Sequence, residues 1–500
     1  MKKIFTLLLV AMTAVVARAT DYIVPVTVVV NDVTSEQLGE FSIVENDGLY
    51  DVNLKNFILD SENGPMGVGN VELKGIQPYQ DGKATLFVTE KEVTITDGDD
   101  PNIDIWMAGM LPPVNVLLRG KIEDEHLYMN LYIDLMETMD QIIQVTVGEG
   151  YQMPNPSFEL WHPSDETHVE PDGWHSFETA TGALAAFGGH HLTKSKNAHS
   201  GEACARIYSS SILGIVANGT MTTGRLNADA MIATDPANNA YLDVYMPDLD
   251  GAGKPFYIPL YSRPDSIAVW VRFRQGSVNP DHPYANISAV ITDGTYYQDP
   301  EDKEYTNVVA KAMNNQIAAT DGEWVRVTAP FVYTENAVEP QAILVTISTN
   351  ADAGQGSDGD EVLVDDIELI YNAKVTGLKI NGQDVPGFSP DVFEYEMELE
   401  QGVTTEDIEV VVEGQSTHVI KDVSFIDSNV CTVMALGGDM KHMSTYVIRE
   451  KGSSTAIRSI KTSAGQSAYY TLDGRQAKTL APGRIYIRRQ ADGTVTKVRL

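Results

Sequence analysis

Short runs in which apolar and polar residues alternate recur along most of the chain, with Gly, Asn and Asp between them. An alternation of period two is typical of β-strands that bury one face, and the spacing expected of helices is nearly absent. The clearest strand candidates are SIAVWVRF (266–273), NISAVIT (286–292) and AILVTIS (342–348). The pattern therefore predicts an all-β protein.

Breaks in this pattern divide the chain into several β units, as expected for 500 residues when a domain holds about 100–200. Residues 20–150 predict a meander that closes into a barrel, with a sandwich as the alternative. Residues 151–373 open with two prolines and predict a jelly-roll β-sandwich. Residues 374–450 predict a small Ig- or cadherin-like β-sandwich, and residues 451–500 a short β tail.

The chain starts with the pattern of a secretory signal peptide. MKKIFTLLLVAMTAVVARA (1–19) has two lysines, then an apolar stretch, then a small-residue end, so Thr20 is the predicted first mature residue. No later apolar run is long enough to span a bilayer. The sequence therefore predicts an exported protein, secreted or at the cell surface, without a transmembrane segment.

Charge excludes some partners. The formal net charge is −35, from 35 basic and 70 acidic residues, so neither nucleic acid nor anionic lipid is an expected partner. Abundant carboxylates also make calcium sites easy to form. Residues 451–500 differ, because ten basic residues minus two acidic ones give +8, and we interpret this tail as a separate unit.

The chain has two cysteines, Cys204 and Cys431, both within apolar, β-like runs. Two distant cysteines in an exported protein of this length do not form a disulfide framework. We therefore expect two buried free thiols.

The run VLVDDIELIY (362–371) carries two aspartates inside an apolar strand. Strand alternation puts Asp365 on the same face as Leu363, Ile367 and Leu369, where a carboxylate without a partner would be costly. It puts Asp366 on the opposite, solvated face. End strands of a jelly roll commonly lie side by side, so Glu159 could approach Asp365. Either a cation such as calcium lies between these carboxylates, with carbonyl oxygens of 197–202 as further ligands, or both accept ordinary hydrogen bonds.

Five motifs in order, NPSFELW, PDGWHS, AHSGEACARI, EWVRVTAPFVY and VLVDDIELIY, cover most of 151–373. This segment resembles a domain family of gut and oral Bacteroidetes named for a role in carbohydrate metabolism, which is similar to jelly-roll carbohydrate-binding modules. The resemblance implies that Glu159 and Asp365 hold a structural calcium ion.

Three further resemblances concern the flanking units. The stretch LKNFIL…VGNVELKGI and its strand–turn pattern resemble calycin-like barrels of secreted Bacteroidetes proteins, and VTGLKINGQDVPGF is similar to the start of cadherin-like modules. The tail motif LDGR…PGRIYI resembles type IX secretion sorting domains, which implies attachment to the outer-membrane surface. The alternative is a hairpin pair that caps the preceding domain.

Sugars present apolar C–H faces and many hydroxyls, so their sites combine flat aromatic rings with polar groups. The predicted ligand-binding residues are Trp161, Trp174, Tyr296 and Tyr297. The alternative for Trp174, in the loop PDGWHS, is a structural plug over the end of the sandwich. Trp270 and Trp324 lie in strand-like runs and are expected in the core or on a sheet face.

No catalytic residue is identified. The chain has no G-x-S-x-G and no H-E-x-x-H motif, and His190-His191 is interpreted as a solvated pair. These observations favour an exported protein whose central jelly roll binds a polysaccharide or other glycan without cleaving it. The alternatives are a glycoside hydrolase, whose two carboxylates follow no short motif, and a non-catalytic surface or adhesion protein.

Overall fold

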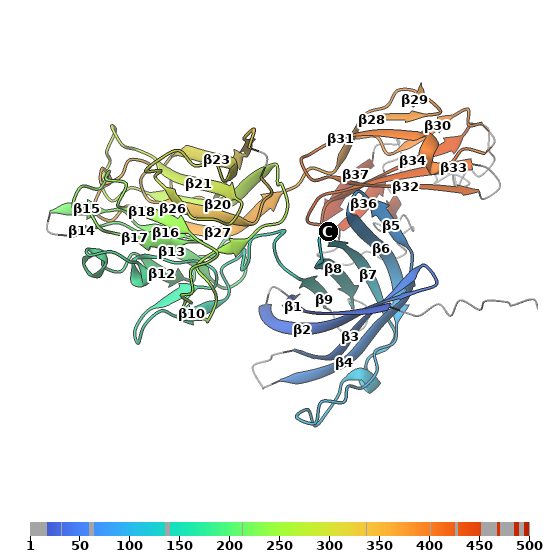
Figure 1. Ribbon diagram of the computed structural model, residues 1–500, viewed down its shortest axis with the longest axis horizontal. Helices are drawn as coiled ribbons and strands as arrows, with labels where there is room; N and C mark the ends of the chain where they lie inside the picture. Colours follow the sequence, from blue (N-terminus) through green and yellow to red (C-terminus); the bar gives the residue numbers. More distant parts are fainter. Residues whose placement is uncertain are drawn as a thin grey trace, which may run out of the picture.

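The all-β prediction is confirmed by the computed structural model, in which antiparallel sheets account for nearly all regular structure (Figure 1). Its helical elements, within the described residues, are four short 3-10 turns: η1 (Ala108–Met110), η2 (Phe177–Thr179), η3 (Ala185–Phe187) and η4 (Thr405–Asp407). None of the helices in this part of the chain is long and apolar enough to cross a membrane. The structure describes residues 18–31, 33–59, 65–135, 141–212, 214–336, 338–400, 402–425, 429–451, 468–470, 485–489 and 495–499.

Two sequence predictions fall largely outside these residues. The signal peptide 1–19 is described only from Arg18, where the first strand begins, and most of the tail 451–500 lies outside the described residues. Three strands of the tail form a small antiparallel sheet: β35 (Ala468–Tyr470), β36 (Ile485–Arg489) and β37 (Val495–Arg499). The export and attachment hypotheses therefore stay predictions.

The N-terminal unit is one nine-stranded antiparallel meander that curls into a half-barrel (Figure 1). The two edge strands, β4 (Met66–Ile76) and β5 (Pro78–Asp81), follow each other in the chain with only Gln77 between them. Among the described residues, no hydrogen-bonded ladder joins these two strands. The sheet order is β4 (Met66–Ile76), β3 (Leu49–Leu59), β2 (Val33–Asn46), β1 (Arg18–Val30), β9 (Ile142–Val147), β8 (His126–Asp134), β7 (Val114–Glu123), β6 (Ala84–Val93) and β5 (Pro78–Asp81).

The central unit is a sandwich of two antiparallel sheets, the layout of a jelly roll. The five-stranded sheet has the order β12 (Leu192–Ser195), β13 (Cys204–Tyr208), β27 (Glu361–Ile370), β20 (Ser266–Arg274) and β24 (Val325–Pro330). The six-stranded sheet has the order β16 (Thr220–Thr222), β26 (Ala342–Ser348), β21 (Ala285–Thr292), β23 (Val308–Ile317) and β25 (Val332–Tyr333), with β19 (Ile258–Pro259) paired to β26.

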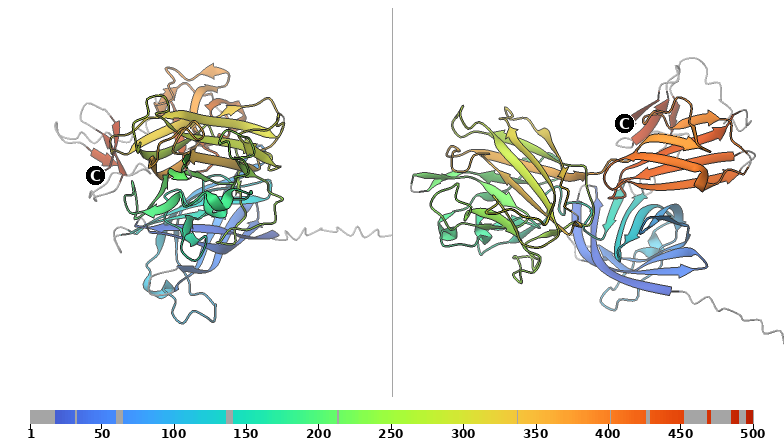
Figure 2. Two further views of the ribbon diagram at one scale, coloured as in Figure 1. Left: turned by 90° about the vertical axis from the view of Figure 1, so that its left-hand side faces the viewer. Right: turned by 45° about the horizontal axis from the view of Figure 1, so that its top comes forward.

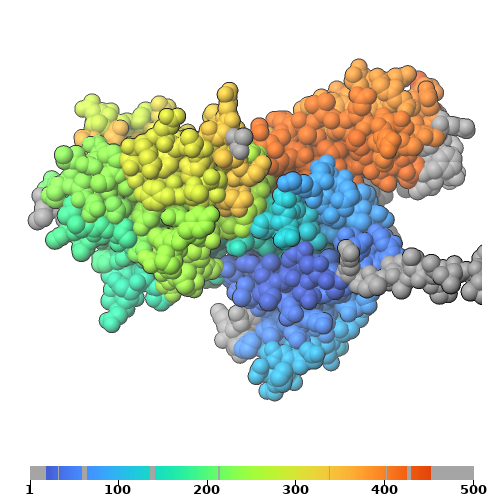
Figure 3. All heavy atoms as spheres, in the orientation of Figure 1, coloured from blue at the N-terminus to red at the C-terminus, as the bar shows by residue number. Residues whose placement is uncertain are grey.

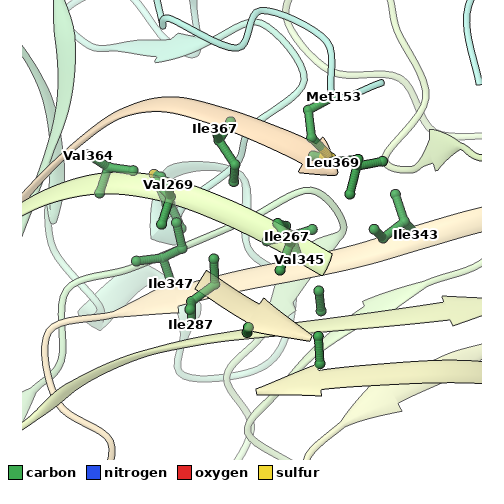
Figure 4. Close-up of a cluster of buried hydrophobic side chains, with 14 of the residues drawn as sticks. Met153, Ile267, Val269, Ile287, Ile343, Val345, Ile347, Val364, Ile367 and Leu369 are labelled. Atoms are coloured by element: carbon green, nitrogen blue, oxygen red, sulfur yellow. The ribbon is translucent and has the colours of Figure 1, made fainter. Parts of the chain in front are cut away.

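Alternate residues of both sheets form the core between them. Ile267 and Val269 of β20 face Val345 and Ile347 of β26 across the two layers (Figure 4). Short strands at the ends of the sandwich complete the unit: β10 (Trp161–Pro163) with β11 (Val169–Pro171), β14 (Ser210–Ile212) with β15 (Ile215–Ala217), and β17 (Arg225–Asn227), β18 (Asn239–Leu242) and β22 (Tyr297–Asp299).

A second, smaller sandwich follows. One sheet has the order β29 (Gln383–Asp384), β28 (Lys374–Ile380) and β31 (Ile408–Glu413), and the other β30 (Glu394–Met397), β34 (Met443–Glu450), β33 (Asn429–Leu436) and β32 (His418–Phe425). The β30–β34 pair is parallel. Cys431 is buried in this core and Cys204 in the central unit, both as free thiols, so the cysteine prediction is confirmed.

The three units meet at one junction (Figures 2 and 3). Its apolar cluster joins Tyr128 of β8, Tyr151 at the start of the central unit and Ile420 of β32. The fully buried Asp439 lies there too, accepting a hydrogen bond from Gln152 Nε2 at 3.0 Å and one from the backbone N–H of Lys441 at 3.1 Å. The half-barrel and the small sandwich therefore share a buried interface with the first residues of the central unit.

The junction makes a pH-dependent contribution to stability. Burial alone would raise the pKa of Asp439, but interactions with His442, Gln152 and Lys441 outweigh it and lower that pKa below its usual value. A carboxyl with a lowered folded-state pKa stabilises the fold above its unfolded pKa, about 3.9, and loses that contribution as pH falls. We expect Asp439→Asn to lower the melting temperature at pH 6 and to lessen its fall from pH 5 to pH 3.

Thermal unfolding monitored at several pH values measures this effect. Asp47→Asn is the matched control, because Asp47 is an exposed turn residue with φ +52°, a conformation that Asn tolerates. Identical pH profiles for Asp439→Asn and wild type would contradict the assignment.

Candidate functional site

A β-bulge in β27 places the two aspartates. Val364, Ile367 and Leu369 all point into the core (Figure 4). Inward-facing residues are two positions apart in a regular strand, but Val364 and Ile367 are three positions apart, with Asp365 and Asp366 between them. Asp366 adopts a left-handed backbone conformation with φ +44°, which accommodates the extra residue. The prediction that Asp365 shares a face with Ile367 and Leu369 is therefore wrong. Asp365 lies on the outer face of the five-stranded sheet.

Asp365 is nevertheless fully buried, because the loop 197–203 covers it. Its Oδ2 accepts hydrogen bonds from the backbone N–H groups of His199 at 2.7 Å and Ser200 at 3.2 Å. Its Oδ1 accepts the N–H of Asp366 at 2.9 Å. Backbone amides thus supply the partners that a buried carboxylate requires.

Glu159 binds the same loop from the opening segment of the unit. Its Oε1 accepts the backbone N–H groups of Glu202 at 2.9 Å and Ala203 at 3.0 Å. The N–H of Ile367 donates to the carbonyl of Pro156 at 2.9 Å, so the opening segment lies beside β27. That segment is a series of turns rather than the expected strand, and the first strand of the unit starts at Trp161.

Asp366 also binds the loop 197–203 and is not a freely solvated side chain. Its Oδ1 accepts the Ser200 hydroxyl at 2.6 Å, and its Oδ2 lies 2.6 Å from His199 Nδ1, with 28% of the side chain exposed. Three carboxylates therefore hold the loop 197–203 against the sheet, those of Asp365, Asp366 and Glu159. We call this arrangement the clamp.

This arrangement satisfies Asp365 without a cation. Burial, with the nearby Asp366, raises the pKa of Asp365 to about 7, and the three amide N–H groups act in the opposite direction. A calcium ion needs about six to eight oxygen ligands, whereas N–H donors face both oxygens of Asp365. Structural calcium held by Glu159 and Asp365 stays a prediction.

An aromatic cluster lies on the outer sheet face next to the clamp. The His199 ring stacks on Trp270 at a centroid distance of 3.9 Å and an angle of 16°, and Trp324 meets His199 edge-on at 5.8 Å. Both tryptophans are partly exposed. The Arg272 guanidinium lies 5.9 Å from the centre of the Trp324 ring.

Charged groups surround this cluster. Arg206 and Arg274 both pair with Glu361, and Arg326, which lies opposite Trp270 in the sheet, pairs with Glu368. Arg272 has no ion pair within the part of the chain that the structure describes, and its guanidinium is therefore available for a further hydrogen-bond acceptor. The face thus combines flat rings with hydrogen-bonding side chains.

The sequence already contained a signal for Trp270. In SIAVWVRF the core residues are Ile267, Val269 and Val271, so strict alternation puts Trp270 in phase with Arg272 and on the outer face. Sequence reasoning left core and sheet-face roles open for this residue, and the structure selects the sheet face.

Two of the predicted ligand-binding residues have no accessible ring. Trp174 is fully buried and packs on Phe158 with ring centres 5.5 Å apart. Tyr297 is 1% exposed and packs edge-on against Tyr305. Both fill core space, Trp174 because its loop folds back into the sandwich, so we withdraw them as binding platforms.

The other two predicted residues are accessible, but they lie apart in different sheets. Trp161 of β10 is partly buried, donates its indole N–H to the Phe158 carbonyl, and has Lys194 Nζ 5.7 Å from its ring centre. Tyr296, next to β22, is 40% exposed and lies 5.8 Å from the Tyr241 ring. A role for Trp161 or Tyr296 in ligand binding stays a prediction.

Comparison with known proteins leaves the family of this chain open. No family model matches the sequence, and no curated protein matches it. The chain is similar to a crystal structure provisionally described as a glycoside hydrolase from Bacteroides thetaiotaomicron, with 17% sequence identity and a TM-score of 0.33. The match covers 59% of this chain and 89% of the other. A likeness this distant transfers no activity, so function must be argued from the residues.

Proposed function

We propose that the central sandwich binds a glycan on the outer face of its five-stranded sheet, at Trp270 and Trp324, without cleaving it. The observation that carries this proposal is the partial exposure of two neighbouring tryptophans, Trp270, which strand alternation turns away from the core, and Trp324, which directly precedes β24. Apolar faces of sugar rings pack on indole rings, and hydroxyls bond to arginine and carboxylate groups beside them. Arg272, Asp366 and Glu368 supply such groups here.

The environment of the nearby carboxyls favours binding over hydrolysis. A glycosidase needs two accessible carboxyl groups that flank the bond, one of them protonated near neutral pH. Asp365 has a suitably raised pKa of about 7, but it is fully buried beneath the loop 197–203. Glu361 and Glu368 are each already engaged in an ion pair with an arginine. Release of reducing ends from a polysaccharide by the purified protein would instead support the hydrolase alternative.

We expect Trp270→Ala and Trp324→Ala each to weaken glycan binding at least tenfold, about 1.4 kcal/mol, because each removes a stacking surface. A glycan array that includes neutral, uronate-containing and sulfated polysaccharides identifies the ligand, and isothermal titration calorimetry on the full chain then measures affinity. Trp270→Phe keeps a smaller ring and should retain part of the affinity.

Tyr245→Ala is the control, since Tyr245 is 78% exposed and lies outside the five-stranded sheet. Melting curves of each variant establish that it is folded. Unchanged affinity in both tryptophan variants would place the site elsewhere, with Tyr296 the next candidate. Absence of affinity for any glycan would favour the surface or adhesion protein.

The proposal includes the cellular setting predicted from the two ends of the chain. Export through residues 1–19 would deliver the protein to where polysaccharides occur, and attachment through residues 451–500 would retain it at the cell surface.

A further inference from the structure

Three loops at one end of the central sandwich bring together a set of nitrogen and oxygen ligands that the sequence did not reveal. His168 belongs to the turn between β10 and β11, Glu178 to η2, and His190 to the loop before β12. One donor atom from each lies within 4.8 Å of the others. The interpretation of His190-His191 as a solvated pair is therefore wrong for His191, which is fully buried, and incomplete for His190.

The two imidazole rings and the carboxylate are in direct contact. The His168 and His190 rings stack with centroids 3.3 Å apart and an angle of 21°. Nδ1 of His190 contacts Oε1 of Glu178, and Nδ1 of His168 lies 3.9 Å from Oε2 of Glu178. Asp165 Oδ2 is 2.7 Å from the same His168 nitrogen and is the nearest further oxygen ligand.

The backbone positions of these ligands are fixed by neighbouring hydrogen bonds. On the η2 side, the Glu178 N–H donates to Ser176 Oγ at 3.3 Å, and Ser176 in turn donates its N–H and its hydroxyl to the buried Glu170, both at 2.6 Å. On the hairpin side, Asp165 Oδ1 accepts the His168 N–H at 2.8 Å. These hydrogen bonds orient the segments that carry Glu178 and His168, which is the role of outer-shell partners at metal sites.

Charge explains why these groups suit a cation. Glu178 and the neighbouring Asp165 are acidic side chains in contact with the two rings, and each ring offers one nitrogen as a ligand atom. Two neutral imidazoles with one carboxylate are a ligand set of borderline divalent transition metals, with bond lengths of about 2.0–2.2 Å for zinc. Calcium prefers oxygen ligands and is disfavoured by the nitrogens.

We propose that His168, Glu178 and His190 bind one zinc-class divalent ion, with Asp165 or water completing the coordination. The ion would join the β10–β11 turn to η2 and to the loop before β12. The His190 side chain is 48% exposed, so the site opens to solvent and exchanges its metal with the medium.

Isothermal titration calorimetry of the full chain with zinc chloride tests this proposal. We expect binding of one zinc ion per chain, no competition from calcium, and at least a tenfold loss of affinity in His190→Ala and in Glu178→Gln. His282→Ala is the matched control, because His282 is also partly exposed and contacts a carboxylate, Asp352, at 2.7 Å, but belongs to no group of three metal-ligating side chains among the described residues.

Two outcomes would overturn the proposal: no zinc binding by wild type, or zinc affinity that is equal in wild type, His190→Ala and Glu178→Gln. Melting curves in the absence of metal establish that the variants are folded. If a variant fails to fold, protection of wild-type histidines from diethylpyrocarbonate by zinc replaces it, and unchanged labelling of His168 and His190 counts against the site.

Discussion

Replacing Asp365 by alanine is expected to lower the free energy of unfolding of the central sandwich by about 3–5 kcal/mol. The substitution removes the acceptor of three backbone N–H groups, those of His199, Ser200 and Asp366, at a position with no exposed surface. The unpaired amides stay buried unless the loop 197–203 detaches from the sheet. Chemical unfolding followed by tryptophan fluorescence measures the effect, because four of the five tryptophans lie in this sandwich.

Asp366→Asn is the control for this experiment. It keeps a residue that tolerates the left-handed conformation, and its partly exposed side chain should cost no more than about 1 kcal/mol. Equal stability of Asp365→Ala and wild type would contradict the clamp. Repeating the measurement with calcium or a chelator also tests the calcium prediction: a calcium-dependent rise in stability that Glu159→Gln and Asp365→Ala abolish would confirm it, and no response would leave the amides as the partners.

Trp174→Ala is expected to cost about 3–5 kcal/mol of stability and to leave glycan affinity unchanged at temperatures where the variant is folded. Trp174 is fully buried, so its removal leaves a cavity beside Phe158. Trp174→Phe should cost clearly less, because the indole N–H has no hydrogen-bond partner among the described residues and its loss breaks no bond. Thermal melting and titration with the identified glycan measure both quantities.

The opposite pattern for Trp174→Ala, retained stability with lost affinity, would restore Trp174 as a binding residue and contradict its assignment to the core. The Trp270 variants provide the contrast within the same unit, since they are expected to change affinity with a smaller effect on stability.

Strand positions were predictable because alternation is a local property. The run predicted as 342–348 is β26 (Ala342–Ser348), and 266–273 differs from β20 (Ser266–Arg274) by one residue. The bulge in β27 was not predictable in the same way, since it depends on a left-handed Asp366 rather than on a glycine. Because the bulge adds one residue, Asp365 lies on the outer face of the sheet and not on the inner face that strict alternation predicts.

The candidate sites depend on contacts between segments far apart in sequence. The prediction that Asp365 and Glu159 need partners was sound, but their partners are amides of a loop more than 160 residues from Asp365. Likewise, ten and twelve residues separate His168, Glu178 and His190, a spacing that matches no short metal motif. The loop PDGWHS left Trp174 either as an exposed platform or as a structural plug over the end of the sandwich, and the fold shows that the side chain is buried.

The shared interface around Tyr128, Tyr151 and Ile420 has a consequence for multivalent recognition. Units joined through buried apolar contacts do not rotate independently, as they would on a flexible linker. If the half-barrel or the small sandwich also contacts the polymer, the distance between that second contact and Trp270 is fixed by the packing of the units. Avidity would then discriminate between long chains by the interval at which suitable sugar residues repeat.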